Sequence, residues 1–321
     1  MYIFFGCTFL PESIGKNNEI IVIVSPEDKE FINSYIYQLF FHTIHTPQPE
    51  SEFSIKFEYP WNLNKVSKNS NLIIISLDFP ADSTGDLLMQ RIRNTNNQHN
   101  ELFVMNNLYA NNQIICAINT TDAISMSLQI LKNKEWILNA FRENYLRKIK
   151  LHLDKQEINY SLSDNINNIF GHRMNIQSDY KIIMSDSTIP FIWIGRDSPY
   201  RWIAIHKSKK DKFENINTAW MEIEQIYNKS IPSIQIDGNY RYQETIKYLN
   251  NNRKIMRGIY NHDESESGGP FFVYIFDTKI ENEVILISGF VNYPGHEKLI
   301  LLKQLEVIAF SIYKGDENYE W

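Results

Sequence analysis

The sequence predicts an α+β protein of two layered domains, each a mainly antiparallel sheet packed with helices. Short β-branched runs recur along the chain and indicate strands. Amphipathic stretches with helical spacing separate these runs. Most connections are short, which suits antiparallel pairing, and no strict strand–helix–strand alternation or glycine fingerprint favours a parallel nucleotide-binding sheet. At 321 residues the chain is long for one domain and comfortable for two.

The first half combines strands with helices. Ser25 and Pro26 have the chemistry of a helix start, which predicts a first helix over residues 26–42. Apolar residues repeat every four positions between Ile137 and Leu153, so one long helix is predicted from residue 121 or 122 to about 155. The other predicted elements are strands at 20–24, 53–59 and 72–77, an extended loop at 46–50, a helix at 84–94 and a hairpin of 102–109 with 113–119.

The second half has the same style. Gly171 is a typical residue just beyond a helix and ends a short helix predicted over residues 161–170. Gly268 and Gly269 precede a strand that begins near Pro270. The other predicted elements are strands at 180–184, 191–195, 201–206, 257–261, 271–276 and 284–291, and a helix at 218–228.

A strongly apolar helix closes the chain between residues 296 and 313. Steps of three and four residues place five side chains on one stripe, which predicts that they are buried. These are Leu299, Leu302, Leu305, Ile308 and Ile312. The charged Lys298, Lys303 and Glu306 are expected to remain in solvent.

A domain boundary is predicted near residue 156, in the polar stretch after the long helix. The predicted organisation is a leader remnant and tether at residues 1–19, an N-terminal α+β domain at 20–155 and a C-terminal α+β domain at 156–321. Composition is ordinary for a globular protein, with 43% apolar and 22% charged residues. The net charge of −6 argues against a nucleic-acid partner.

Few residues have metal-binding or nucleophilic spacing. The chain has no GxGxxG, HExxH, GxSxG or CxxC motif. His42 and His45 have a spacing that permits metal binding, but no third ligand is evident, so we predict no metal and no cofactor. Cys116 lies within an apolar run and is expected to be a buried small side chain.

One candidate binding cluster surrounds a predicted strand–turn–strand and consists of Trp193, Arg196, Asp197, Arg201 and Trp202. Tryptophan and arginine together can bind a sugar or an acidic group by stacking and forked hydrogen bonds. The structural alternative is an arginine–aspartate pair that holds the turn.

A second candidate is the acidic loop that contains Asp263 and Glu264. It offers oxygen ligands, but its order does not match the calcium loop of an EF-hand. The alternative is a solvated loop between two strands.

The order of motifs in the C-terminal third resembles the bacterial domain of unknown function 4837 family, which reads roughly RGLW, GGPFVS and GFVYAP at the same places. The matching segments here are Arg257–Tyr260, Gly268–Val273 and Gly289–Pro294. The resemblance extends from about Gly15 to Ile312 and departs from the family at Asn292 and at residues 300–303. The family has no assigned activity and consists largely of lipoproteins.

The N-terminal residues bear on whether the protein is exported to the cell envelope. Phe4-Phe5-Gly6-Cys7 resembles the end of a lipoprotein signal peptide, in which Cys7 is the lipidated residue. No basic region precedes it, and the apolar run is shorter than a working signal needs. Either the true start lies upstream or the export signal has been lost. In a third interpretation residues 2–5 form a short packed strand.

These observations leave two hypotheses for function. The first is an envelope-associated, lipid-anchored, non-catalytic binding or assembly protein with a protein or glycan partner. The second is an envelope enzyme that acts on glycans or peptides through carboxylates. The lack of a catalytic motif favours the first. If Met1 is the true start, the protein is expected in the cytoplasm.

Overall fold

The structure is a computed structural model that describes residues 9–249, 251–263 and 267–314. Its described residues fall into two compact units. Residues 9–42 and 51–148 form unit 1, and residues 43–50 and 149–314 form unit 2. The predicted class, α+β in two layered domains, is confirmed.

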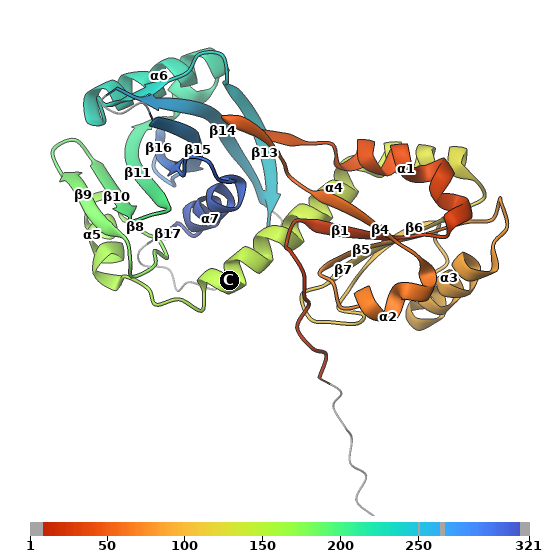
Figure 1. Cartoon of the computed structure of the whole chain (residues 1–321). Coiled ribbons are helices and arrows are strands. Elements are labelled where there is room, and N and C mark those ends of the chain that lie inside the picture. The colour runs from red at the N-terminus through yellow and green to blue at the C-terminus, as the bar shows by residue number, and fades with distance from the viewer. Residues whose placement is uncertain (1–8, 250, 264–266, 315–321) are drawn as a thin grey trace, which may run out of the picture. The chain divides into compact units, whose positions relative to one another are not determined.

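Unit 1 contains a five-stranded sheet with helices on both faces (Figure 1). The strand order is β4 (Ser54–Glu58), β1 (Glu19–Ile23), β5 (Asn71–Leu77), β7 (Ile114–Thr120) and β6 (Leu102–Asn106). The helices α1 (Pro26–Phe40) and α4 (Ala123–Leu153) cover one face, and α2 (Leu63–Val66) and α3 (Ser83–Asn96) cover the other. A short 3-10 turn, Pro60–Asn62, precedes α2.

The expected antiparallel pairing is wrong for most of this sheet. The strand β1 runs parallel to β4 and β5, and β5 runs parallel to β7. Only the predicted hairpin of β6 and β7 is antiparallel. Because helices cover both faces, β5 is buried along its whole length, and its residues from Leu72 to Ile75 are apolar on both sides. Such continuous apolar runs are typical of parallel strands.

The two faces of this sheet have separate cores. Leu88, Met89 and Ile92 of α3 pack on Ile74 and on other residues of β1, β5, β6 and β7. On the opposite face, the rings of Phe40 in α1 and Phe141 in α4 meet edge to face at 5.4 Å. The predicted start of α1 is confirmed, because the Ser25 hydroxyl accepts a hydrogen bond from the Asp28 amide.

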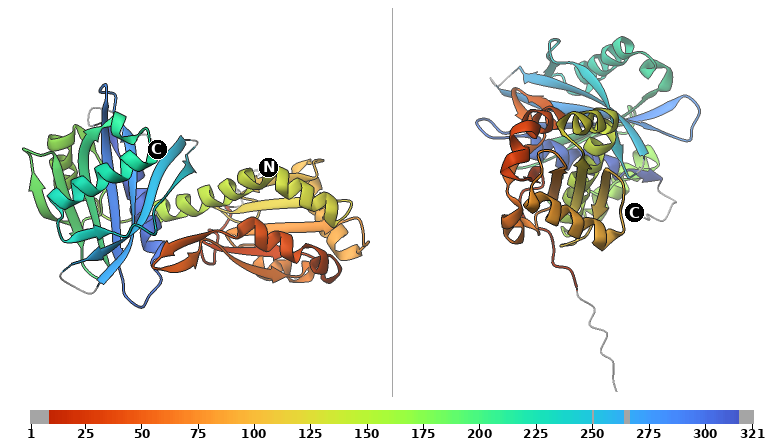
Figure 2. Two further views of the ribbon diagram at one scale, coloured as in Figure 1. Left: turned by 90° about the horizontal axis from the view of Figure 1, so that it is seen from above. Right: turned by 90° about the vertical axis from the view of Figure 1, so that its right-hand side faces the viewer.

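Unit 2 is built on an eight-stranded antiparallel sheet (Figure 2). The strand order is β12 (Ile234–Ile236), β14 (Asn251–His262), β15 (Ser267–Asp277), β16 (Glu283–Asn292), β11 (Tyr200–Lys209), β10 (Phe191–Arg196) and β9 (Lys181–Asp186), with β13 (Tyr242–Tyr248) also paired to β14. Two short ladders pair β8 (His172–Arg173) with β17 (Tyr313–Lys314) and β2 (Thr43–Thr46) with β3 (Gln48–Ser51).

Helices pack on this sheet from both sides. The helix α6 (Ile216–Ser230) follows a 3-10 turn at Lys210–Phe213 and covers one face, where its Trp220 and Tyr227 meet Phe271 and Phe290. The helix α7 (Leu299–Phe310) packs on the other face (Figure 1). The short helix α5 (Tyr160–Phe170) ends at Gly171 as predicted.

Close approach of two strands explains one glycine of the family motif. A Cβ atom at Gly269 would lie 1.9 Å from the carbonyl oxygen of Val291 in β16. Any other side chain would therefore push β15 away from β16. The sequence predicted that Gly268 and Gly269 precede the strand, but both lie within β15, and the close contact gives the physical reason for a glycine at position 269.

Candidate functional site

The candidate cluster of the β10–β11 hairpin is divided between the two faces of the sheet. Trp193 and Trp202 pack against the core under α6. Arg201 points to the α7 face, where its guanidinium donates to Gln304. Arg196 forms an ion pair with Asp179 at 2.5 Å. The tryptophan and arginine side chains therefore do not converge on one ligand.

Of the remaining predicted residues, one lies in the turn of this hairpin, one lies apart from it, and two lie outside the described part of the chain. Asp197 is exposed in the turn between β10 and β11. Asp263 follows β14 and accepts a hydrogen bond of 3.0 Å from the Gln235 amide. Glu264 and Cys7 lie outside the described residues.

The two histidines with metal-like spacing contact other groups. The Nδ1 atom of His42 lies 3.0 Å from a carboxylate oxygen of Glu52, and the His45 ring packs against the Tyr240 ring. Within the described residues, no group of three or more histidine, cysteine, aspartate or glutamate side chains is arranged to hold a metal ion.

A buried charge cluster stands at the centre of unit 2. Arg257, the first residue of the family motif, is 1% exposed and donates to Glu306 of α7 at 2.8 Å. It also donates to Glu244 of β13, and Lys303 lies 3.2 Å from the second oxygen of Glu306. Burial alone lowers the pKa of Arg257, but Glu244 and Glu306 raise it well above its usual value.

This cluster corrects the expectation for the last helix. All five predicted apolar residues of α7 and its C-terminal flank are buried, as expected. Lys303 and Glu306, however, are also buried, at 3% and 0% exposure. Two positive and two negative side chains balance each other, so the cluster has the composition of a structural salt-bridge network rather than an open binding site.

A lysine–serine cluster in unit 1 has the residue types of a Ser–Lys catalytic pair. The ammonium group of Lys148 donates to the hydroxyl of Ser13 at 2.9 Å and to the hydroxyl of Ser70. Both hydroxyl protons are directed to backbone carbonyls, those of Asn112 and Ile14 respectively. A serine nucleophile must instead give its proton to a neutral lysine. Burial lowers the pKa of Lys148, but the direction of these hydrogen bonds gives the cluster a structural role. We name Lys148, Ser13 and Ser70 the lysine–serine clamp.

The clamp holds the segment that was predicted as a tether. The Ser13 amide donates to Asn111 and the Ile14 amide donates to Lys68, while the Ser70 amide donates back to Ile14. These backbone hydrogen bonds of 2.9–3.0 Å attach the segment to the loops that lead into β5 and β7. The described residues before β1 are therefore part of unit 1.

A buried histidine in unit 2 lacks hydrogen-bond partners. His206 of β11 is 3% exposed and stacks on Phe191 at 4.5 Å, and neither ring nitrogen has a partner among the described residues. Burial lowers the pKa of His206 to about 3. On the same face of the sheet, Tyr227 donates to Ser288 at 2.7 Å. The imidazole is therefore neutral at physiological pH and belongs to the core.

The helix α4 exposes a stripe of aliphatic side chains, which we name the α4 stripe: Ile124, Leu128 and Leu131. They are 70%, 62% and 73% exposed, respectively. Their spacing of four and three residues places them on one face of the helix. Met126 and Ile130, on the opposite side, are buried under the sheet. The first half of α4 therefore has two apolar faces, of which only one is covered by described residues.

The sequence contains the signal for the α4 stripe, but the signal is ambiguous. The spacing of residues 124, 128 and 131 is visible in the sequence, but the second apolar face at Met126 and Ile130 has the same period. From the sequence alone, a helix with two apolar faces is expected to be buried on both of them. Only the fold shows which of the faces meets the sheet.

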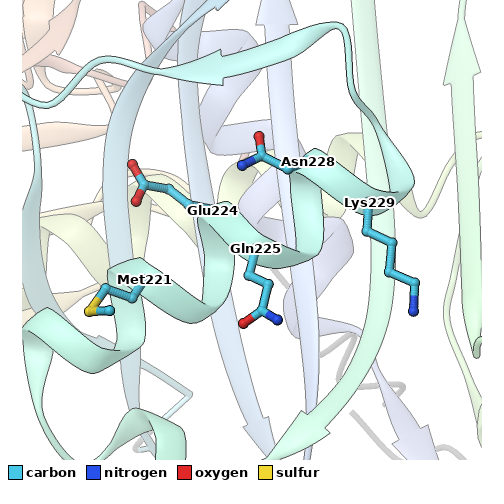
Figure 3. Close-up of a pocket in the computed structure, with 5 residues that line it drawn as sticks. All are labelled: Met221, Glu224, Gln225, Asn228 and Lys229. Carbon is cyan, nitrogen blue, oxygen red and sulfur yellow. The ribbon is translucent and has the colours of Figure 1, made fainter.

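The hollow drawn in Figure 3 lies on the outer surface of α6. The described residues that line it are Met221, Glu224, Gln225, Asn228 and Lys229, all from this one helix. A ligand pocket usually has several walls that cover most of the ligand. A hollow with one wall does not provide such an enclosure.

The comparisons with protein families agree with the C-terminal motifs. Residues 159–311 match the family described as Domain of unknown function (DUF4837). The resemblance predicted from these motifs is confirmed for this segment. Residues 13–153 match a different family, Domain of unknown function (DUF8532), so the first resemblance does not extend over the N-terminal half.

Comparisons with individual proteins add little. No curated protein sequence matches the chain. The Ran-binding protein Mog1p of Saccharomyces cerevisiae is 8% identical over 46% of this chain and 91% of its own, with a TM-score of 0.31. LpqN, involved in cell envelope biogenesis of Mycobacterium tuberculosis, is 14% identical over 44% of this chain and 81% of its own, with a TM-score of 0.26. At these TM-scores neither similarity bears on the function of this chain.

Proposed function

We propose that the protein is a non-catalytic binding or assembly protein of the cell envelope, and that the α4 stripe is where a partner protein docks. Exposed contiguous apolar surface is costly in water and is typical of interaction sites. Ile124, Leu128 and Leu131 are each more than three-fifths exposed and share one helix face. This single observation carries the proposal.

The shape of the stripe favours an apolar groove on the partner protein. Anchors at positions i, i+4 and i+7 on a helix are the pattern with which an amphipathic helix enters an apolar groove. Lys132 and Glu135 flank the stripe and are exposed. They provide the polar rim that surrounds the apolar centre of a protein interface.

The proposed compartment rests on the sequence. The segment Phe4-Phe5-Gly6-Cys7 resembles a lipidation site, and the family resembled by the C-terminal half consists largely of lipoproteins. No helix among the described residues is both long and apolar enough to span a bilayer. We propose that a lipid on Cys7 anchors the protein to the membrane. Growth with a fatty-acid probe tests this, because Cys7→Ala should abolish labelling of the purified protein.

Site-specific photo-crosslinking tests the docking site. A photoreactive amino acid at position 128, in the full-length protein expressed in its native cells, should give one adduct of defined mass. The matched control is the same residue at position 221, because Met221 is 68% exposed on a helix of unit 2. Adding Ile124→Asp and Leu131→Asp should abolish the adduct at position 128. Equal adducts from both positions would contradict a specific docking site.

A further inference from the structure

The carboxyl ends of β1 and β5 form a topological switch point in unit 1. The chain leaves β1 through α1 and continues to β4 on one side, whereas β5 lies on the other side and continues into α3. The helices α1 and α3 lie on opposite faces of the sheet (Figure 1). In open sheets with parallel strands, ligands bind outside the carboxyl ends of the strands at such a point.

Acidic side chains collect at this point. Asp28 lies in the first turn of α1, directly after β1, and Asp78 follows β5. Asp82 caps α3 and Asp86 lies in its first turn. Asp28 is fully buried, whereas Asp82 and Asp86 are half-buried, and the charges of both act on Asp28. The edge therefore has one buried carboxylate and two partly open ones.

Two carboxylate oxygens at this edge lack hydrogen-bond donors. One oxygen of Asp28 accepts a hydrogen bond of 2.9 Å from the Leu77 amide at the end of β5. Its other oxygen, Oδ1, is buried without a donor among the described residues, and so is Oδ2 of Asp82. A buried acceptor without a donor is costly, so an arriving N–H group would be strongly favoured.

The charges around Asp28 are all of one sign. Burial is the main reason why its pKa rises to about 6, and Asp82, Asp86 and Glu27 raise it further. The hydrogen bond from Leu77 opposes this rise but does not cancel it. The contrast with Arg257 is direct, because two carboxylates balance that buried charge.

We propose that this edge of unit 1 binds the ammonium or guanidinium group of an organic ligand between Asp28, Asp82 and Asp86. Such groups supply both a positive charge and several N–H donors, which the unpaired oxygens of Asp28 and Asp82 lack among the described residues. Asp86 already accepts a hydrogen bond of 3.2 Å from the Ser76 hydroxyl and would contribute mainly its charge. The backbone amides at the two helix starts are already paired within the chain. The Asp28 amide donates a hydrogen bond to Ser25, and the Gly85 amide donates one to Asp82. Phe79, 75% exposed in the loop between β5 and α3, offers an aromatic face for the cation.

Binding to the full-length protein can be followed by carboxyl-detected NMR with two probes, acetyl-Gly-Arg-Gly-amide and spermidine. Saturable shifts at Asp28, Asp82 and Asp86 and a fall in the pKa of Asp28 are expected with at least one of them, and the shifts at Asp82 and Asp86 also report binding when Asp28 is replaced. Saturation by the peptide alone indicates a partner's side chain, and saturation by spermidine alone indicates a free amine. Acetyl-Gly-Gln-Gly-amide, which is uncharged, should not bind.

Three variants decide the assignment. Asp28→Asn should weaken binding about tenfold to a hundredfold, as expected for the loss of one charge-assisted hydrogen bond. Asp86→Asn, at a half-buried position, provides a second test that does not alter the core. Glu30→Gln, exposed on α1, should leave binding unchanged. Equal shifts with the uncharged peptide, or unchanged affinity in both aspartate variants, would overturn the proposal.

Discussion

The two units bury charge in opposite ways. In unit 2, Arg257 and Lys303 are balanced by Glu244 and Glu306. In unit 1, Asp28 is buried next to other acids, and one of its oxygens has no donor among the described residues. A balanced buried cluster stabilises one arrangement of the chain, whereas an unbalanced one retains capacity to bind a cation. The comparison therefore separates a structural network from a candidate site.

The largest effect is expected from breaking the balanced cluster. Glu306→Leu should destabilise the protein by about 3–5 kcal/mol, because it leaves Arg257 buried with only one of its two carboxylates. Urea denaturation measures the change. Glu297→Ala, an exposed position just before α7, is the control and should stay within about 0.5 kcal/mol. Adding Arg257→Met to the Glu306 variant should restore much of the loss, and no restoration would mean that charge balance is not the cause.

The second largest effect is expected from creating a cavity beneath α7 by shortening a buried apolar side chain. Leu305→Ala should cost about 2–5 kcal/mol, because Leu305 is fully buried against the sheet. Ile300→Ala, at a position 38% exposed on α7, should cost clearly less. Denaturation midpoints of the two variants are compared. Equal small shifts would mean that α7 packs only loosely on unit 2.

His206 should make the protein less stable in acid. Its pKa is about 3 in the folded protein and 6.5 in its ordinary state, so the unfolded chain binds more protons between these values. Stability is therefore complete above pH 6.5 and falls as the pH drops below it. The loss between pH 6.5 and 4.5 is about 2–3 kcal/mol. His206→Phe should flatten this part of the stability profile, and an unchanged slope would contradict the assignment.

Asp28 should make the protein less stable as the pH rises, which is the opposite of the effect of His206 and is smaller. Its pKa is raised from 3.8 to about 6, so the folded protein holds the extra proton between these values. This stabilisation is complete below pH 3.8 and is lost as the pH rises through 6, by about 1–3 kcal/mol. Asp28→Asn should therefore be more stable than the natural protein at pH 7.5 and show no such decline. Unfolding free energies at pH 4 and 7.5 test this.

Much of the fold followed from local patterns. The helix start at Ser25 and Pro26, the helix end at Gly171 and the buried stripe of α7 were predicted correctly, because each depends on residues close in sequence. The relationship of the C-terminal half also followed from its glycine motifs. The direction of the strands in unit 1 did not, because β1 and β5 pair residues that are 51 positions apart in the sequence, such as Ile21 and Leu72.

The candidate sites depended still more on tertiary structure. Trp193 and Arg201 lie close in sequence, but alternation along β-strands sends them to opposite faces. The sequence predicts Lys303 and Glu306 as solvent-exposed charges. In the fold, Arg257 of β14 contacts Glu306 as well as Glu244 of β13, and the charges are buried together. The sequence shows that Asp28 follows one apolar strand and Asp78 another, but only parallel pairing brings the ends of those strands to one edge.

The sequence by itself determined most of the helices and strands, the α+β class in two domains and the family resemblance of the second half, but it missed β2, β3, β12 and β13. Tertiary structure alone decided which charges are balanced and which apolar faces remain uncovered. The physical reason is that propensity and periodicity act over a few residues, whereas burial and charge compensation depend on groups from distant parts of the chain. Asp28 and Arg257 are both charged residues in regular elements, and only their surroundings distinguish a candidate site from a structural network.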